Sequence, residues 1–469
     1  MSVINTNVNS LIAQNALAKN QSSLNTSLER LSTGLKINTG ADDPAGLIAS
    51  QSLQAEQVGL QSAISNATGA NNVIGTAEGG LNEVSNLLTQ LNGLVNASAN
   101  TGGLSSDEIA ANQLQVDSIL STINRLAGST TFNGNHLLNG NLDYTTSSVA
   151  TSAFSSIAIN QANLPSNQTQ TVKVSVLNSA TNGQVSYAAL TASGATTLQI
   201  AGNTGTQQLS FGSGTTIAQI ATAINNVTST TGVTASANAT TLTFLAGTSG
   251  SANYVSVQAL TGHNFTITGG TGGKAFGKDA DVEINGAQAE AQGTNVTYSS
   301  DSLDLNFTLS AALNAGKSKT FGITGGGATF ALGATVSDAT NASIGIQSVS
   351  TGSLGNSTIG FLNTLGSGGT NSLSSANLTN AQSIVSTAIS QVASTRGRLG
   401  AFQDYTIGST INSLNVAYEN ASSAESAITN TDFAAETANL TRDQILSQAA
   451  TSVLSQANAA PQLVLKLLS

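Results

Sequence analysis

The feature that most constrains the fold is a narrow apolar stripe along residues 378–428. Apolar side chains recur there every three or four residues, the spacing that places them on one face of an α-helix. After residue 405 the stripe resumes one residue late, as a nearly straight helix of about 3.6 residues per turn would require. We therefore predict one long helix packed against a second long helix. The positions expected to make this packing are Leu378, Val385, Val392, Leu399, Phe402, Ile411 and Leu414.

The partner helix is expected in the N-terminal region. Residues 1–36 carry leucines spaced by seven, with further leucines in the alternate positions of the same stripe. A second apolar run follows over residues 47–94, after a turn. The two ends of the chain thus form a helical hairpin, with a body inserted between them. The leucines of the first run are Leu17, Leu24, Leu28, Leu31 and Leu35.

Local signals set the helix ends. Asp43 is expected to cap a helix whose first residue is Pro44, since proline is favoured at that position. Capping also explains the neighbouring pair Asp42 and Asp43 better than a metal site, because no other ligand type lies nearby. Ser106 is expected to cap a further helix that runs to about Leu126. Two Asn-Gly pairs, at residues 133 and 139, predict tight turns.

The amino-acid composition and the spacing of apolar residues change between residues 141 and 371. This segment is rich in Gly, Thr, Ser and Asn, and its apolar residues alternate over short runs, which predicts antiparallel β-structure. One helix is expected within it, at residues 216–227. Whether the segment forms one domain or two is left open. The alternating runs include Val172, Val174 and Val176; Leu198 and Ile200; Leu242 and Phe244; and Leu303, Leu305, Phe307 and Leu309.

Composition narrows the function. The chain has 469 residues, of which only 8% are charged, and its net charge of −10 argues against nucleic-acid binding. It contains no cysteine, so neither disulfides nor thiolate metal sites can form. With two histidines and no His-Glu-x-x-His pattern, we expect no catalytic site, cofactor or metal. We also expect no transmembrane helix and no cleavable signal peptide.

The last segment, residues 431–469, returns to a helical pattern. Asp432 or Thr431 is expected to cap it, and Pro461 to stop or bend it. Five of the last seven residues are aliphatic, which predicts a tail buried in an assembly or covered by a chaperone; a fraying apolar end is the alternative. The positions expected to take part in packing or assembly here are Phe433, Leu440, Leu446, Val453, Leu463 and Leu465.

Four motifs resemble those of bacterial flagellins. Two lie near the N-terminus: residues 30–38 (RLSTGLKIN) followed by 42–46 (DDPAG), and residues 125–134 (RLAGSTTFNG). Two lie near the C-terminus: residues 431–441 (TDFAAETANLT), and residues 444–450 (QILSQAA) continuing to 457–468 (ANAAPQLVLKLL). Within the middle, residues 215–225 and 232–236 resemble, more weakly, a repeat inserted in some flagellins and hook-associated proteins.

The resemblance implies a subunit that self-assembles into a flagellar filament for swimming motility, outside the cell. It implies export through the flagellar type III apparatus, a chaperone on the C-terminal helix, and contacts with junction and cap proteins of the filament. It also implies five segments. These are a core helix (1–40), a rod half (41–140), a surface β-region (141–371), a second rod half (372–430) and a C-terminal core helix (431–469).

Two alternatives to a simple filament subunit stay open. The first is a hook–filament junction protein, which would share the helical ends, although residues 457–462 look like filament flagellin. The second is an added adhesive role for residues 141–371.

In flagellins detected by the vertebrate Toll-like receptor, an Arg, a Leu four residues later and a Glu on the next helix form the contact centre. The resemblance places Gln90, Leu94 and Gln115 at those positions, so the apolar anchor is kept and both charges are lost.

Overall fold

The computed structural model describes residues 6–100, 103–164, 168–188, 194–238, 240–261, 267–300, 302–310, 313–375 and 377–468, without the side chains of 339 and 461–468. The chain divides into two compact units. Unit 1 comprises Met1–Thr68, Leu332–Val336 and Ser409–Ser469, and unit 2 comprises Gly69–Ala331 and Ser337–Gly408. Helical ends flank a β-rich middle, as the sequence predicts.

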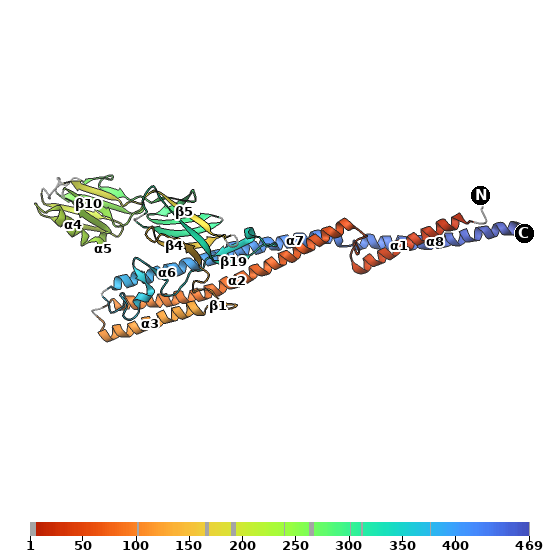
Figure 1. The fold of residues 1–469 in the computed structure, drawn as a ribbon, viewed down its shortest axis with the longest axis horizontal. Coiled ribbons are helices and arrows are strands. Elements are labelled where there is room, and N and C mark those ends of the chain that lie inside the picture. Colours follow the sequence, from red (N-terminus) through yellow and green to blue (C-terminus); the bar gives the residue numbers. More distant parts are fainter. Residues whose placement is uncertain are drawn as a thin grey trace. The chain divides into compact units, whose positions relative to one another are not determined.

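Unit 1 contains two pairs of helices. The first helix, α1 (Val8–Thr33), lies antiparallel to the last, α8 (Phe433–Leu468), so that Asn7 meets Ala457 and Ser27 meets Glu436 (Figure 1). The unit 1 part of α2 (Pro44–Ser98) packs against α7 (Ser409–Thr429). The buried residues of this second contact are Leu60, Ala63, Leu414 and Ala421.

Capping side chains begin these helices. Asn7 caps α1. Asp43 caps α2, as predicted, since its carboxylate accepts a hydrogen bond of 2.9 Å from the amide of Gly46. For α3 (Ser106–Ser129) the prediction was wrong by one residue. The N-cap is Ser105, which forms a reciprocal capping box with Glu108. The Glu108 side chain reaches back to the Ser105 amide, and this second bond selects Ser105 over its neighbour.

The single straight helix predicted over residues 378–428 is interrupted. The chain forms α6 (Leu378–Ala401), then a π-helical segment, η3 (Phe402–Gly408), then α7. A π-helix closes hydrogen bonds over one more residue than an α-helix does. The one-residue slip of the apolar stripe is therefore concentrated at η3 rather than spread along a straight helix. Phe402 and Ile407, on either side of the slip, both stay buried.

Of the two outcomes predicted at Pro461, a stop or a bend, the stop does not occur, because α8 runs on to Leu468. Proline removes one backbone hydrogen bond, and the helix continues past it here. No helix within the described residues combines the length and apolarity needed to span a membrane.

The helical part of unit 2 includes residues 69–98 of α2, with α3 folded back along it, and α6 (Figure 1). An irregular segment, residues 351–373, contacts both α3 and α6 through the short 3-10 helix η2 (Leu362–Leu365). Its leucines are fully buried, and side chains of α3 bind its backbone. Gln113 donates to the carbonyl of Leu365 (2.9 Å) and accepts from the amide of Leu373 (2.8 Å). We call residues 351–373 the wedge segment.

A small hairpin follows α3. Strands β1 (Thr131–Phe132) and β2 (Asn135–His136) pair antiparallel. The turn residues Asn133 and Gly134 have φ of 49° and 83°, the positive values that a type I′ turn requires. The first predicted Asn-Gly turn is thereby confirmed.

The β-rich middle of unit 2 holds two hydrophobic cores, which answers the question of one domain or two. The inner β-domain is an antiparallel sheet in the order β3-β18-β5-β14-β15-β16-β17-β4. Its core contains the predicted valines of β5 and the leucines of β17. The strands are β3 (Tyr144–Ser147), β4 (Phe154–Ala162), β5 (Gln170–Asn178), β14 (Asp281–Ile284), β15 (Ala287–Gln292), β16 (Asn295–Ser300), β17 (Leu303–Leu309) and β18 (Lys317–Gly326).

The outer β-domain contains two further sheets, β12-β6-β10-β9 and β13-β11-β7-β8, around one core. Helix α4 (Ile217–Asn225) buries its isoleucines in that core, and Thr216 caps it, so the helix predicted there is confirmed. A short helix, α5 (Thr228–Thr231), follows. The strands are β6 (Gln184–Ala188), β7 (Thr196–Ala201), β8 (Thr206–Phe211), β9 (Val233–Ala237), β10 (Thr241–Ala246), β11 (Tyr254–Thr261), β12 (Ile267–Thr268) and β13 (Lys274–Phe276).

The remaining elements are short and lie between the inner β-domain and α6 in the chain. They are β19 (Ala328–Ala331) paired with β20 (Asn341–Ile344), η1 (Asp338–Thr340), and β21 (Gly355–Asn356) paired with β22 (Gly360–Phe361).

Candidate assembly interface

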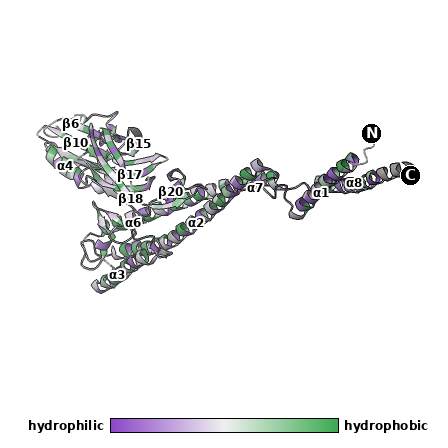
Figure 2. Ribbon diagram, turned by 45° about the vertical axis from the view of Figure 1, so that its right-hand side comes forward, coloured by the Kyte–Doolittle hydropathy of each residue, from purple (hydrophilic) through white to green (hydrophobic). Residues whose placement is uncertain are grey.

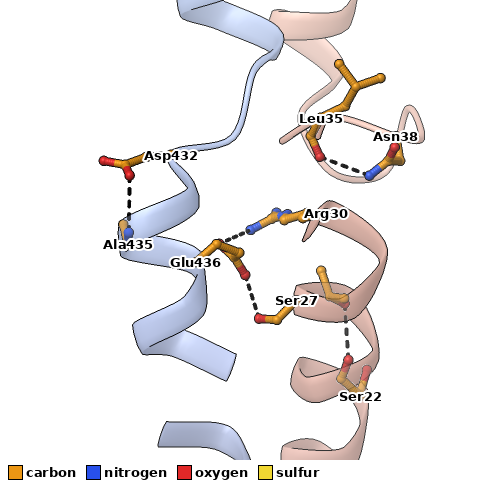
Figure 3. Close-up of polar contacts among 9 residues, drawn as sticks. Ser22, Ser27, Arg30, Leu35, Asn38, Asp432, Ala435 and Glu436 are labelled. Atoms are coloured by element: carbon orange, nitrogen blue, oxygen red, sulfur yellow. Dashed lines mark hydrogen bonds and ion pairs between the residues drawn. The ribbon is translucent and has the colours of Figure 1, made fainter. Parts of the chain in front are cut away.

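A buried polar contact joins α1 to α8 near the end of α1 and the start of α8 (Figure 3). The Ser27 hydroxyl donates a hydrogen bond of 2.5 Å to one carboxylate oxygen of Glu436, and the Arg30 guanidinium lies 4.0 Å from the other. Ser27 and Glu436 are both buried. Because an unpaired buried carboxylate is strongly disfavoured, this contact fixes the register of the two helices.

The backbone reinforces the same junction. Leu35 and Asn430 form an isolated antiparallel bridge, with bonds from the Lys36 amide to the Thr429 carbonyl (2.6 Å) and from the Thr431 amide to the Gly34 carbonyl (2.9 Å). Asp432 then caps α8, accepting from the amides at positions 434 and 435, which confirms one of the two predicted caps (Figure 3).

The carboxylates at the start of α2 are occupied by the backbone. Asp42 accepts hydrogen bonds from the amides of Thr39 (2.7 Å) and Asn38 (3.1 Å), and these bonds, those of Thr39 first, hold the pKa of Asp42 below its ordinary value. Asp43 caps α2. Within the described residues, no group of three or more acidic, His or Cys side chains is placed to hold a metal ion.

The seam between α1 and α8 is built from small and polar residues. In α8 the buried positions are spaced by seven and include two carboxylates, Glu436 and Asp443. In α1 the half-buried Leu17, Leu24 and Leu31 alternate with smaller side chains. A seam of this composition buries little apolar surface. The buried residues of the pair are Ser10, Ala13, Ser27, Glu436, Asp443, Ala450 and Ala457.

Most of the large apolar side chains of the same pair are exposed. Ile12 of α1 and Ile445 of α8 are each 61% exposed, and hydrophobic and hydrophilic residues both occur along α1 (Figure 2). Large exposed apolar patches are characteristic of interaction surfaces. We call this set the outer apolar face. It comprises Val8, Leu11, Ile12 and Leu28 of α1, Leu35 just after α1, and Phe433, Ile445, Leu446 and Val453 of α8.

The sequence-derived packing positions fall into two groups. In unit 2, Val385, Val392, Leu399 and Phe402 are buried and Leu378 is half-buried; in unit 1, Leu414 is buried, while Ile411, Leu24, Leu31 and Leu440 are half-buried. The other group, Leu28, Leu35, Phe433, Leu446 and Val453, belongs to the outer apolar face. The side chains of Leu463 and Leu465 lie outside the described residues.

Sequence reasoning missed the polar half of the seam. Ser27 and Glu436 face each other, whereas the predicted stripe placed the neighbouring Leu28 in line with Leu24 and Leu31. The spacing of seven from Glu436 through Asp443 and Ala450 to Ala457 is the signal that identifies the buried side of α8. An apolar-only search overlooks it because half of these residues are acidic.

The receptor positions lie on two neighbouring helices of unit 2. Gln90 on α2 and Gln115 on α3 are exposed, and Leu94 on α2 is half-buried. All three therefore have at least part of their side chain accessible, which a contact centre needs. Their role stays a prediction.

Three family models match the chain. The bacterial flagellin N-terminal helical region matches residues 4–143 and the bacterial flagellin C-terminal helical region matches residues 382–468. The flagellin hook IN motif matches residues 197–251, which lie in the outer β-domain and include the weaker of the sequence resemblances.

Full-length relatives agree with these models. The chain is similar to the B-type flagellin of Pseudomonas aeruginosa, at 30% identity over 99% of each chain, and to the flagellin of Salmonella typhimurium, at 32% over 99% of each. Among solved structures, the D2-D3 domains of the flagellar cap protein of Serratia marcescens share 20% identity, covering 36% of this chain and 98% of that one, with a TM-score of 0.26, from which we draw no conclusion. The chain belongs to the bacterial flagellin family and is a structural subunit of the flagellar filament.

Proposed function

We propose that the outer apolar face of α1 and α8 is the surface through which copies of this chain contact one another in the filament. The observation that carries the proposal is the inverted composition of the helix pair. The buried positions of the contact within the chain are small or polar, a few leucines beside them are half-buried, and most of the larger aliphatic residues are exposed. A helix pair normally buries its larger apolar side chains, so we expect another copy of the chain to bury these residues.

The energetics favour an extended polymer. A fully buried aliphatic side chain contributes about 1.5–3 kcal/mol, so each half-exposed position on the face contributes about 1 kcal/mol when it is covered. Several such positions lie on both helices of every subunit. A contact between two different patches that does not close into a ring generates a helical filament.

The same face suggests what happens before assembly. We infer that a chaperone covers the C-terminal part of α8 during export, because an exposed aliphatic surface would otherwise aggregate. In the finished flagellum, junction and cap proteins would meet this face at the two ends of the filament. The filament then lies outside the cell, with residues 141–371 on its surface and the helical segments 41–140 and 372–430 beneath them.

The test is a double substitution on α8. Ile445→Asn with Val453→Asn removes two aliphatic side chains that are more than half exposed. We expect this variant to keep its helical circular dichroism and to fail to extend filament seeds, as judged by sedimentation and negative-stain microscopy. The matched control, Gln444→Asn with Gln448→Asn, changes two exposed polar positions of the same helix and should polymerise normally.

Filaments of normal length from the Ile445/Val453 variant would refute the proposal. Loss of polymerisation by both variants would do so as well, since the effect would then not depend on apolar surface. Deletion of residues 431–469 provides a coarser check, and should leave a soluble chain whose β-domains still fold.

A further inference from the structure

The outer β-domain is inserted into the inner one. The chain leaves the inner domain after β5, at Asn178, and returns at β14, which begins with Asp281. Two crossing segments, residues 179–183 and 277–280, therefore form the whole covalent connection between the two domains. Such double connections are free to bend unless other contacts fix them.

Backbone hydrogen bonds tie the two crossings together. The Thr181 amide donates to the Lys278 carbonyl and the Lys278 amide donates to the Thr181 carbonyl, both at 2.9 Å. The amide of Gly250, in the loop between β10 and β11 of the outer domain, also donates to the Thr181 carbonyl, at 3.2 Å. The crossings thus meet in an isolated antiparallel bridge between Thr181 and Lys278.

Glycines allow the backbones to touch at this point. A Cβ on Gly277 would lie 2.5 Å from the carbonyl oxygens of both Gly250 and Thr181. Gly250 has a φ of +116°, and a Cβ there would lie 2.9 Å from the Cα of Gly293, which belongs to the turn between β15 and β16 of the inner domain. The outer-domain loop therefore rests directly on an inner-domain turn.

One carboxylate bonds both domains at this contact. Asp279, in the second crossing, accepts hydrogen bonds from the Ser251 amide of the outer domain (2.9 Å) and the Gly293 amide of the inner domain (2.7 Å). Its second oxygen accepts from the Ser251 hydroxyl. These bonds, with the Ser251 hydroxyl first, hold the pKa of Asp279 below its ordinary value, so the carboxylate is ionised at neutral pH.

Long-range electrostatics contribute little to holding the outer domain. Residues 184–276 contain a single charged residue, Lys274, and its ammonium lies over the rings of Tyr254 and Phe276 in the same domain. Short-range hydrogen bonds and backbone contact at the junction are thus what remains to orient the domain.

We propose that Asp279 locks this junction, so that the outer β-domain keeps one orientation on the inner β-domain, and that removing its carboxylate turns the outer domain into a swinging module. The lock is a conformational device of the displayed region, and it does not depend on the proposed assembly face.

The absence of cysteine makes the test direct. Spin labels on Gln208→Cys in β8 and Thr297→Cys in β16 report the distance between the two domains, because both positions are exposed and no other residue is labelled. Pulsed dipolar spectroscopy on the full-length monomer should give one narrow distance distribution. In Asp279→Ala the distribution should at least double in width, and salt should not change it in either protein.

Asp281→Ala is the matched control. Its carboxylate lies two residues away and binds Asn178 (3.1 Å) and Gln288 (2.6 Å), both in the inner domain, so the distribution should stay narrow. If Asp279→Ala fails to fold, the isosteric Asp279→Asn replaces it, and a broadened distribution is again expected. A broad distribution in the unmutated chain, or an unchanged width in the folded Asp279 variant, would overturn the proposal.

Discussion

The wedge segment gives the most quantitative prediction for stability. Gln113 is 7% exposed, and its amide satisfies two backbone groups of the wedge segment, the Leu365 carbonyl and the Leu373 amide. Both leucines are buried, at 0% and 2% exposed, so water cannot replace a lost partner there. Gln113→Leu keeps the size of the side chain and removes both hydrogen bonds.

Each buried backbone group left without a partner costs about 1–3 kcal/mol, or about 2–6 kcal/mol for the two. The buried aliphatic side chain that replaces the amide offsets about 1 kcal/mol of this. We expect a net loss of about 3 kcal/mol in the free energy of opening the wedge segment. Because about 1.4 kcal/mol is a factor of ten, the opening equilibrium should rise by about 100-fold.

Amide hydrogen exchange followed by mass spectrometry measures this opening directly. Peptides covering residues 362–373 should exchange about 100-fold faster in Gln113→Leu, while peptides of the outer β-domain keep their rates. Gln115→Leu is the control, since its side chain is exposed on the same helix, and it should leave all rates unchanged. Exchange of residues 362–373 within about threefold of the parent chain would refute the reasoning.

The remaining predictions concern the helix seam, pH and the receptor. Leu399→Asp places a charge at a fully buried position and should reduce the free energy of unfolding by several kcal/mol, which lowers the melting temperature. Ser422→Asp, at an exposed position, should leave the melting temperature nearly unchanged. Equal melting temperatures would show that the seam is misplaced. Burial raises the pKa of Asp117, but hydrogen bonds from the wedge segment outweigh it and hold that pKa below its ordinary value. The stability that the Asp117 carboxylate contributes is therefore present above the unfolded pKa and is lost as pH falls. The difference in urea unfolding midpoint between the parent chain and Asp117→Asn should accordingly shrink from about pH 6 to pH 3. A constant difference would contradict this prediction. Gln90 and Gln115 lack the charges of the receptor contact, so the monomer should activate a Toll-like receptor reporter cell weakly. The double variant Gln90→Arg with Gln115→Glu should restore part of the response. Potent activation by the parent chain would end this hypothesis.

The sequence by itself determined the elements that depend on local chemistry. The caps at Asp43 and Asp432, the Asn133 turn and the alternating strand at residues 303–309 all follow from groups within a few residues of each other. Cap, turn and strand geometry are satisfied by neighbouring backbone amides and by the two-residue side-chain period, so a single sequence carries the information. The helical ends and the β-rich middle were predictable for the same reason.

Only the tertiary structure decided which surfaces meet. An apolar stripe has the same sequence pattern whether it packs within the chain or against another copy. The sequence therefore did not reveal that Ser27 and Glu436 lie in the seam while Leu28 is exposed. The one-residue slip of the long stripe fits both a straight helix and a local π-helix, and packing placed it at residues 402–408. The three hydrogen bonds of Asp279 join residues 251, 279 and 293, which are brought together only by the fold. Contacts of this kind depend on the closure of long loops, and local propensity does not encode that closure.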